Sequence, residues 1–244
     1  MTEPDPPGAL PFLARPAERA VQVAAALRVA VVSGDLAAGG RLVPERIAAE
    51  MGVSRPTVIA AVRRLAREGL VTIGQNGRPY VVGLTPRYVA DLYHFRMALD
   101  QAVVSTIAEQ ALPAEAVDRL QDITALMKLR AHQGDLSAFA GLDLDFHTTY
   151  LSLAGNQFLA GAWEAISDVA YALLTVTDRL SQALPLIAGI HEEIFLGLRA
   201  ADGPRVVAAL QRHYQTGENI LADPYHEQHG ALMETAAPAA QFAE

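Results

Sequence analysis

The sequence predicts a mainly α-helical protein, in which an N-terminal winged helix-turn-helix with a small β-hairpin precedes a C-terminal antiparallel all-α bundle. Residues 44–82 combine two helix signals, a tight turn and a hairpin signal, in that order. From about residue 88 onward, apolar residues recur at helical spacing and not with the alternation of a strand. With 51% hydrophobic residues, the 244-residue chain also has enough apolar material for the cores of two domains.

The helix-turn-helix prediction rests on spacing and on capping residues. Ala48, Gly52 and Val58 are spaced as two packed helices require, because a small residue allows close approach and glycine adopts the left-handed conformation that ends a helix. Pro44 suits the first turn of the first helix, and Ser54 can cap the second. These residues predict two short helices joined by a tight turn.

A hairpin is predicted directly after the second helix. Two short apolar segments flank GQNGRP, and the pair Asn76-Gly77 favours the tip of a β-hairpin. A helix-turn-helix followed by such a hairpin is a winged helix, which predicts double-stranded DNA as the partner. Several polar residues on the second helix and the wing lie away from the core face and are available to phosphates or base edges. They are Arg55, Thr57, Arg63, Arg64, Arg67 and Arg78.

The charge distribution separates two parts of the chain. Residues 1–84 carry 10 Lys and Arg against 7 Asp and Glu, a net charge of +3, whereas residues 85–244 carry 9 against 20, a net charge of −11. DNA would attract the first part and repel the second. This asymmetry supports a DNA-binding domain at 15–83 and a helical domain at 89–222, joined by a hinge at 84–88. The ends of the chain, 1–14 and 223–244, are rich in Pro, Ala and polar residues and are expected to be loose tails.

Composition also excludes several classes of site and location. The chain contains no cysteine, which excludes a disulfide framework and a thiolate metal site. Its first residues are acidic and rich in proline, unlike a signal peptide, and no apolar run approaches the length of a membrane span. These features predict a cytoplasmic protein with no membrane partner.

Helical periodicity and punctuation predict the individual helices. The first is expected over 17–33, with a buried stripe formed by Val21, Ala24, Leu27 and Val31. Six more are expected in the helical domain, separated by turns that contain proline or glycine, Pro185 among them. Their predicted ranges are 88–111, 113–132, 135–153, 156–177, 183–201 and 203–221.

One carboxylate and three histidines are candidate metal ligands. Asp143 and His147 are four residues apart and therefore share one face of a helix. His191 and His213 lie in the last two predicted helices. Such a set can hold Zn²⁺, Ni²⁺ or Mn²⁺ inside a helical bundle. On spacing alone, the alternative that these are hydrogen-bonded core histidines stays open.

Motifs in both halves of the chain are similar to those of one bacterial family. The N-terminal half contains SGDLAAGGRL, PERIAAEMGVSRPTV, RRLAREGLV and NGRPYVV, and the C-terminal half contains LYHFRMALDQ, DLDFHTTYLSLAGN and HEEIFLGL, followed by His213. This arrangement resembles the GntR family of transcription regulators and, in its helical half, the effector-binding domain of the FadR subfamily. The resemblance covers about residues 17–220.

The resemblance implies a metal site, an effector and a dimer. Its motif positions map the divalent metal onto Asp143, His147, His191 and His213, and it implies homodimers on palindromic operators. A small carboxylate effector would reach the metal. Arg96 matches an arginine that could pair with the effector, although a salt bridge to a neighbouring acid is an equal alternative. Asn156 could face the effector pocket or cap the next helix.

One position departs from the family pattern. Ile59 stands where relatives carry an arginine that reaches DNA, so the operator sequence is expected to differ from the usual one. The residues predicted to contact DNA are Arg46, Ser54, Arg55, Thr57, Arg63, Asn76, Gly77 and Arg78.

Together these features predict a repressor controlled by a carboxylate effector. Three alternatives stay open at this point. They are a regulator for which the metal ion itself is the signal, a metal-dependent enzyme, and a DNA-binding protein whose helical domain only dimerises.

Overall fold

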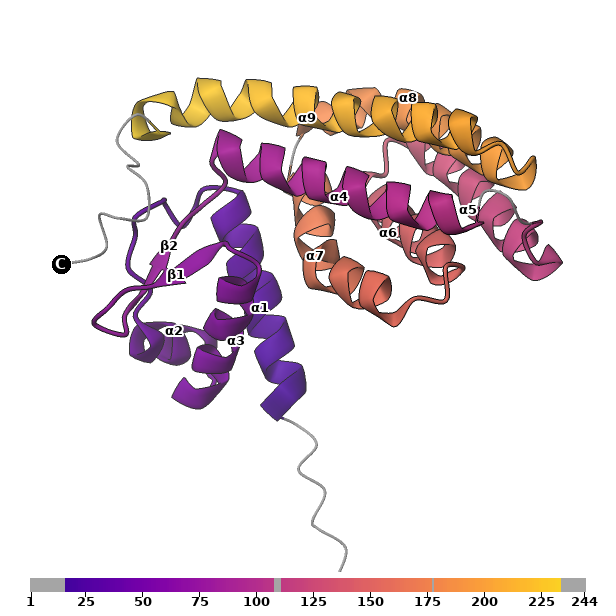
Figure 1. The fold of residues 1–244 in the computed structure, drawn as a ribbon. Helices are drawn as coiled ribbons and strands as arrows, with labels where there is room; N and C mark the ends of the chain where they lie inside the picture. The colour runs from indigo at the N-terminus through magenta and orange to yellow at the C-terminus, as the bar shows by residue number, and fades with distance from the viewer. Residues whose placement is uncertain (1–15, 108–110, 177, 234–244) are drawn as a thin grey trace, which may run out of the picture.

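The computed structural model describes residues 16–107, 111–176 and 178–233 (Figure 1). It contains a smaller N-terminal part and a larger helical part. The predicted loose tail at 1–14 lies outside the described residues. The predicted fold class is confirmed, because the described chain is mostly helical and its β1–β2 sheet is a two-stranded hairpin.

The N-terminal part is a winged helix-turn-helix. Its elements are α1 (Pro16–Val32), α2 (Pro44–Met51), α3 (Arg55–Arg67), β1 (Val71–Ile73) and β2 (Pro79–Val81). The two strands pair antiparallel, with Val71 opposite Val81 and Thr72 opposite Tyr80. Arg41 forms an additional antiparallel bridge to Tyr80, which ties the segment before α2 to the wing.

The local signals in the sequence set these boundaries. Pro44 begins α2, and Gly52 ends it in the left-handed conformation at φ 64°, donating its N–H to the carbonyl of Ala48. The side chain of Ser54 caps α3 by accepting a hydrogen bond from the N–H of Thr57. Gly77 also has a positive φ, at the tip of the wing. The predicted turn, cap and hairpin are therefore confirmed.

The core of this part lies between α1 and α3. Ala24, Leu27 and Val31 are buried, as predicted. Val21 was predicted to belong to the same stripe, but this prediction is wrong because its side chain is 47% exposed. Helical spacing places a residue on a face but does not fix how far along the helix the neighbouring elements reach. On α1, full burial begins at Val23.

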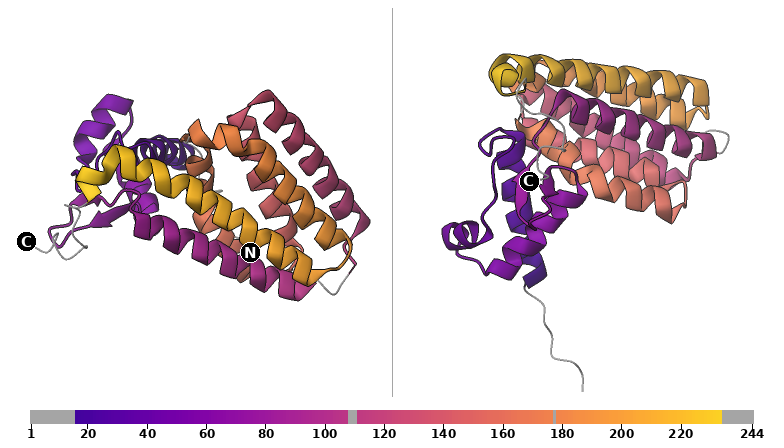
Figure 2. Two further views of the ribbon diagram at one scale, coloured as in Figure 1. Left: turned by 90° about the horizontal axis from the view of Figure 1, so that it is seen from above. Right: turned by 60° about the vertical axis from the view of Figure 1, so that its left-hand side comes forward.

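The helical part contains six helices within the described residues. They are α4 (Pro86–Ile107), α5 (Ala114–Gln133), α6 (Leu136–Ser152), α7 (Gln157–Val176), α8 (Asp178–Arg199) and α9 (Gly203–Met233). Contacts link α4 to α9, α9 to α8, α8 to α5, α5 to α6 and α6 to α7, and a contact between α7 and α4 closes the bundle around a shared core (Figures 1 and 2).

Near three prolines the helices differ from the predicted ones. Pro86 begins α4, so the last residues of the predicted hinge at 84–88 are helical, as a first helical turn allows. Pro185 was predicted to separate two helices but lies inside α8, and α9 continues past Pro224 to Met233. Proline removes one hydrogen bond and bends a helix, but helix can continue on both sides of it.

The two parts of the molecule touch through α1 and α7. Contacts between these helices place the N-terminal part against one side of the bundle, as Figure 2 shows from above. Within the described residues, no helix has the length and apolar character required to cross a membrane.

Candidate functional site

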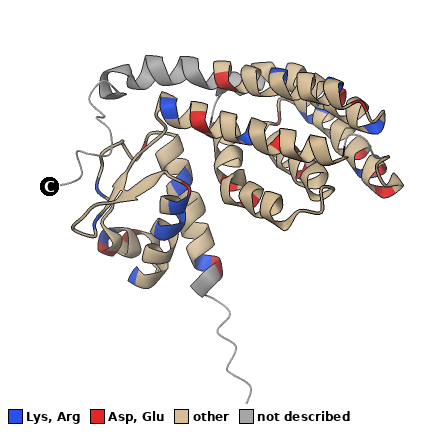
Figure 3. Cartoon of the chain, in the orientation of Figure 1, with Lys and Arg blue, Asp and Glu red and all other residues tan. Residues whose placement is uncertain are grey.

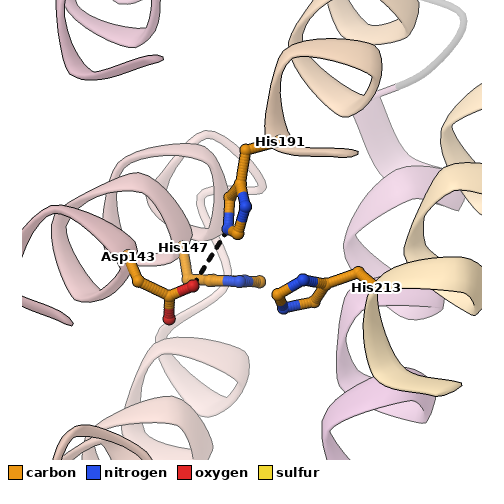
Figure 4. A group of neighbouring side chains, drawn as sticks. All are labelled: Asp143, His147, His191 and His213. Carbon is orange, nitrogen blue, oxygen red and sulfur yellow. Dashed lines mark ion pairs between the residues drawn. The ribbon is translucent and has the colours of Figure 1, made fainter. Parts of the chain in front are cut away.

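Four candidate ligand side chains converge in the interior of the bundle. Asp143 and His147 come from α6, His191 from α8 and His213 from α9 (Figure 4). All four are buried, and each offers one ligand atom within 4.8 Å of the others. Side chains that are up to 70 residues apart in sequence thus face one point.

The local contacts of His191 aim one of its ring nitrogens at this point. Its Nδ1 lies 2.9 Å from the carbonyl oxygen of Ile187, one turn earlier on α8. Its Nε2 lies 3.0 Å from Oδ1 of Asp143. A histidine that donates one N–H to a carbonyl holds its other nitrogen as a free lone pair, which is the usual arrangement of a metal-binding histidine.

The cluster contains buried polar atoms without hydrogen-bond partners among the described residues. They are Asp143 Oδ1, both ring nitrogens of His147, Nε2 of His191 and Nδ1 of His213. Leaving buried polar atoms unpaired is costly, so their concentration at one point calls for a ligand. Three imidazole nitrogens and one carboxylate oxygen fit a divalent cation such as Zn²⁺, Ni²⁺ or Mn²⁺, with coordination positions left over.

The protonation states of the cluster also fit a cation. Burial lowers the pKa of His147 and His213 well below the usual value, which keeps both rings neutral. Burial alone would raise the pKa of Asp143, but a hydrogen bond from the His191 ring, donated when Nε2 carries a proton in place of a metal, holds it well below its usual range. Neutral imidazoles and an ionised carboxylate are the forms that bind metal.

Arg96 lies beside this cluster on α4. Its side chain is 3% exposed, and its Nη2 lies 3.9 Å from Oδ2 of Asp143. Its Cζ is 5.0 Å from the centre of the Tyr214 ring and 5.7 Å from that of Trp163. Its Nε and Nη2 have no hydrogen-bond partner among the described residues. The predicted salt bridge to a neighbouring acid is present as a long ion pair with Asp143, and the Nε and Nη2 groups of Arg96 are available to donate hydrogen bonds to a ligand.

Asp100 belongs to the same environment, although sequence reasoning did not select it. It is buried, it accepts a hydrogen bond from the Tyr214 hydroxyl, and its Oδ2 lies 3.6 Å from Nδ1 of His147. Burial raises its pKa to about 6, against the opposing effect of hydrogen bonds from Tyr150 and Tyr214. The signal that could have found it is its position four residues after Arg96, on the same helical face.

Asn156 lies away from the cluster. It is exposed, and its Oδ1 accepts hydrogen bonds from the N–H groups of Phe158 at 2.9 Å and Leu159 at 3.3 Å. These contacts cap the start of α7. The structure therefore favours the capping alternative over a place in an effector pocket.

The predicted DNA contacts divide into exposed and locally engaged side chains. Arg63 on α3 and Arg78 on the wing are exposed. Arg46 and Arg55 are exposed as well, and they form ion pairs with Glu50 and Glu45.

The polar residues at the start of α3 and in the wing have structural roles. Thr57 is 7% exposed, and its Oγ1 lies 2.8 Å from Oγ of Ser54, so both belong to the cap of α3. Oδ1 of Asn76 accepts a hydrogen bond from the N–H of Arg78 across Gly77 and shapes the wing. Ile59 is half-buried on α3.

Arg64 differs from its expected role. Its helical position predicted an arginine available to DNA, but its side chain donates a hydrogen bond to Asp168 of α7 at 3.1 Å. Even so, α3 carries basic residues and no acidic one, whereas acidic residues occur along the bundle helices (Figure 3).

Comparisons with known proteins agree with this architecture. The model of bacterial regulatory proteins of the gntR family matches residues 19–81, and the FCD domain model matches residues 91–216. The second match alone covers more than half of the chain.

Individual relatives extend over most of the chain. The chain is 26% identical over 212 residues to the gluconate operon transcriptional repressor of Bacillus subtilis, covering 85% of this chain and 86% of the relative. It is 30% identical over 192 residues to an HTH-type transcriptional regulator of Streptomyces ambofaciens, covering 77% and 78%.

A solved structure shows the same fold. A candidate transcriptional regulator, GntR, from Rhodococcus sp. RHA1 superposes with a TM-score of 0.63 at 24% identity, over 84% of this chain and 99% of that one. With its winged helix-turn-helix and its FCD domain, the chain belongs to the GntR family of bacterial transcriptional regulators, which bind DNA.

Proposed function

We propose that this regulator is a repressor whose affinity for operator DNA is controlled by a small carboxylate, bound at a divalent metal site in the helical domain. The observation that carries the proposal is the buried convergence of Asp143, His147, His191 and His213 beside the unpaired donors of Arg96. The FCD domain match also supports an effector-binding role for the bundle.

The residues of the cluster divide the work of binding. Asp143 and the three histidines would hold Zn²⁺, Ni²⁺ or Mn²⁺, which would supply positive charge and open coordination positions for a carboxylate. Arg96 would bind the same carboxylate through Nε and Nη2, since a guanidinium matches the planar geometry of that group. The aromatic rings around Arg96 would exclude water from this pair.

The resemblance of the chain to a gluconate operon repressor supports a small organic acid as the class of effector. Which acid is bound would depend on the shape of the space between Arg96 and the ligand cluster. An effector of this class would act from the cytoplasm on a DNA-bound protein.

The winged helix would read the operator as part of a homodimer. Two copies of α3 would enter successive major grooves about 34 Å apart. Arg46, Arg55 and Arg63, with Arg78 on the wing, would contact phosphates or base edges. A change in operator affinity of about 5- to 150-fold is the usual scale of coupling between an effector and a second site.

The metal content of the purified protein tests the site assignment. We expect close to one divalent ion per chain, and we expect the double variant His147→Ala, His191→Ala to lose it while His132→Ala, an exposed histidine on α5, retains it. Unchanged metal content in the double variant would refute the assignment.

Operator-affinity and turnover assays on the same purified protein distinguish the alternative functions. If the metal ion alone changes operator affinity and no carboxylate adds to the effect, the protein is a metal-responsive regulator. If purified protein turns over a carboxylate, it is a metal-dependent enzyme. If the protein binds DNA as a dimer but neither a metal ion nor a carboxylate binds the bundle or changes operator affinity, the bundle serves only for assembly.

A further inference from the structure

A buried ion pair within the DNA-reading domain holds the end of α3 on α1. Arg28 of α1 donates from Nη2 to Oε1 of Glu68 at 2.6 Å and from Nε to Oε2 at 2.8 Å. Both side chains are at most 5% exposed. Burial would lower the pKa of Arg28, but Glu68 outweighs this effect and raises it, so the arginine stays charged. This two-pronged pair fixes the C-terminal end of α3 within its own domain.

The same pair reaches across to the helical domain through Asp168. Oδ2 of this α7 residue accepts hydrogen bonds from Nη2 of Arg28 at 3.0 Å and from Nη2 of Arg64 at 3.1 Å. Arg64 lies on α3 itself, one turn before Glu68. Asp168 therefore joins α1 and α3 of the DNA-reading domain to α7 of the bundle through one carboxylate oxygen.

A second anchor lies at the start of α4. The hydroxyl of Tyr88 donates to the backbone carbonyl of Glu68 at 2.6 Å. This bond attaches the end of α3 to the helix that connects the two domains. Near the end of α3, residues of α3 and α7 line a cleft of about 270 Å³, to which Arg67 and Glu164 contribute. The two helices are thus not packed along their length, and Asp168 bridges them at one point.

The helix that carries Asp168 also covers the candidate metal centre. Trp163, five residues earlier on α7, has its ring 5.5 Å from that of His147 and 5.7 Å from Cζ of Arg96. Its Nε1 donates to Oγ1 of Thr148 at 2.8 Å, which fixes the indole over the site. A displacement of Trp163 by a bound ligand would move α7 and, with it, Asp168.

From this geometry we infer that Asp168 is a positioning residue that sets the orientation of the DNA-reading domain on the bundle by holding Arg64 and Arg28. Through Arg28 on α1 and Arg64 on α3, Asp168 acts on the position of α3, and it does not itself touch DNA. A fixed orientation matters because the two recognition helices of a dimer must match the spacing of two half-sites. The further step, that a ligand at the metal centre moves α7, rests on the proposed function.

The substitution Asp168→Asn removes the negative charge that both arginines share and leaves one neutral amide oxygen, which is a weaker acceptor. Arg28 keeps both hydrogen bonds to Glu68, so no buried charge is left without a partner. Asp168→Glu retains the carboxylate. Glu164→Gln provides a matched control, since it removes one negative charge from the same helix at an exposed position.

Distances between paired spin labels measure the orientation directly. The chain has no cysteine, so Gln22→Cys on α1 and Gln121→Cys on α5 can be labelled without background. Both positions are exposed. An excess of unlabelled full-length chain ensures that only distances within one chain are read, and the measurement needs neither metal nor effector.

We expect one narrow distance distribution for the parent protein, Glu164→Gln and Asp168→Glu, and a clearly broadened or shifted one for Asp168→Asn. A narrow, unshifted distribution for Asp168→Asn would overturn the inference. It would also be overturned if Asp168→Glu were as broad as Asp168→Asn, because the carboxylate would then not be what holds the domains. Neither outcome depends on the metal content, which tests the proposed function separately.

Discussion

Nε2 of His191 lies 3.0 Å from Oδ1 of Asp143, although the two residues are on different helices and 48 positions apart. Neither atom has a well-aligned hydrogen-bond partner among the described residues, so the short distance between them does not amount to a hydrogen bond. A carboxylate oxygen and an imidazole nitrogen held this close in a buried site would both be stabilised by a cation bound within the four-residue cluster. This relationship leads to the first prediction.

Asp143→Asn should weaken metal binding strongly. The substitution removes the negative charge of the candidate ligand set and keeps its shape. Removal of a hydrogen-bond partner of a metal ligand typically lowers metal affinity by about 10- to 100-fold. We expect a larger loss of metal affinity here, because Asp143 is itself a candidate ligand. Competition with a chelating dye measures it. Asp145→Asn, at an exposed position on the same helix, should bind metal as the parent does. Equal affinities for both variants would contradict the assignment of Asp143.

Asp100→Asn should weaken the same site less. Asp100 lies 3.6 Å from Nδ1 of His147 and accepts a hydrogen bond from Tyr214, so it can orient the imidazole without binding the metal. The expected loss of metal affinity is about 10- to 100-fold, with one ion per chain still bound at saturation. If the stoichiometry falls to zero, Asp100 is a ligand. If affinity does not change, the carboxylate does not orient His147.

Protein stripped of metal should lose thermal stability as the pH falls from 8 to about 6. Burial lowers the pKa of His147 and His213, so near pH 6.5 the unfolded chain binds protons that the folded chain does not. Stability therefore falls as the pH falls through this range. Asp100, with its pKa raised to about 6, acts in the opposite direction, mainly at lower pH.

Melting temperatures across the pH range test this prediction. His213→Gln should flatten the dependence, because it removes one of the two histidines that resist protonation. A melting temperature that rises as the pH falls from 8 to 6 would contradict the neutral state of the two rings.

Arg63→Ala should weaken DNA binding and its dependence on salt. Arg63 is exposed on α3, and loss of one phosphate contact lowers the slope of log affinity against log salt by about 1. The measurement uses a duplex that the parent protein selects from a random pool. Arg130→Ala, on α5 of the bundle, is the control and should bind as the parent does. An unchanged slope for Arg63→Ala would remove Arg63 from the DNA interface.

Local signals in the sequence predicted the DNA-reading domain closely. Gly52 must adopt a positive φ, and Ser54 caps α3 with its own side chain, so short segments determine these features. The pair Asp143 and His147 was predictable for the same reason, since one turn of helix sets their spacing. His191 and His213, which are distant in sequence, were candidates from their predicted helices, and the family resemblance was needed to assign all four residues to one site.

Features that depend on tertiary packing were not predictable. Asp168 meets Arg28 across 140 positions, and no periodicity reports such a contact. Arg64 was expected to face DNA because its helical position allowed it, but the neighbouring bundle supplies a carboxylate that binds it. Pro185 was predicted to separate two helices. A proline inside a helix has a local cost in free energy, whereas the tertiary packing that offsets this cost involves residues distant in sequence.

The most direct test of the central claim is the operator affinity of metal-loaded protein, titrated with a panel of small carboxylates at fixed salt concentration. We predict that at least one acid lowers operator affinity by about 5- to 150-fold, and that Arg96→Gln abolishes this response while the metal content stays unchanged. An operator affinity that no carboxylate changes, in protein shown to contain one metal ion per chain, would contradict the claim.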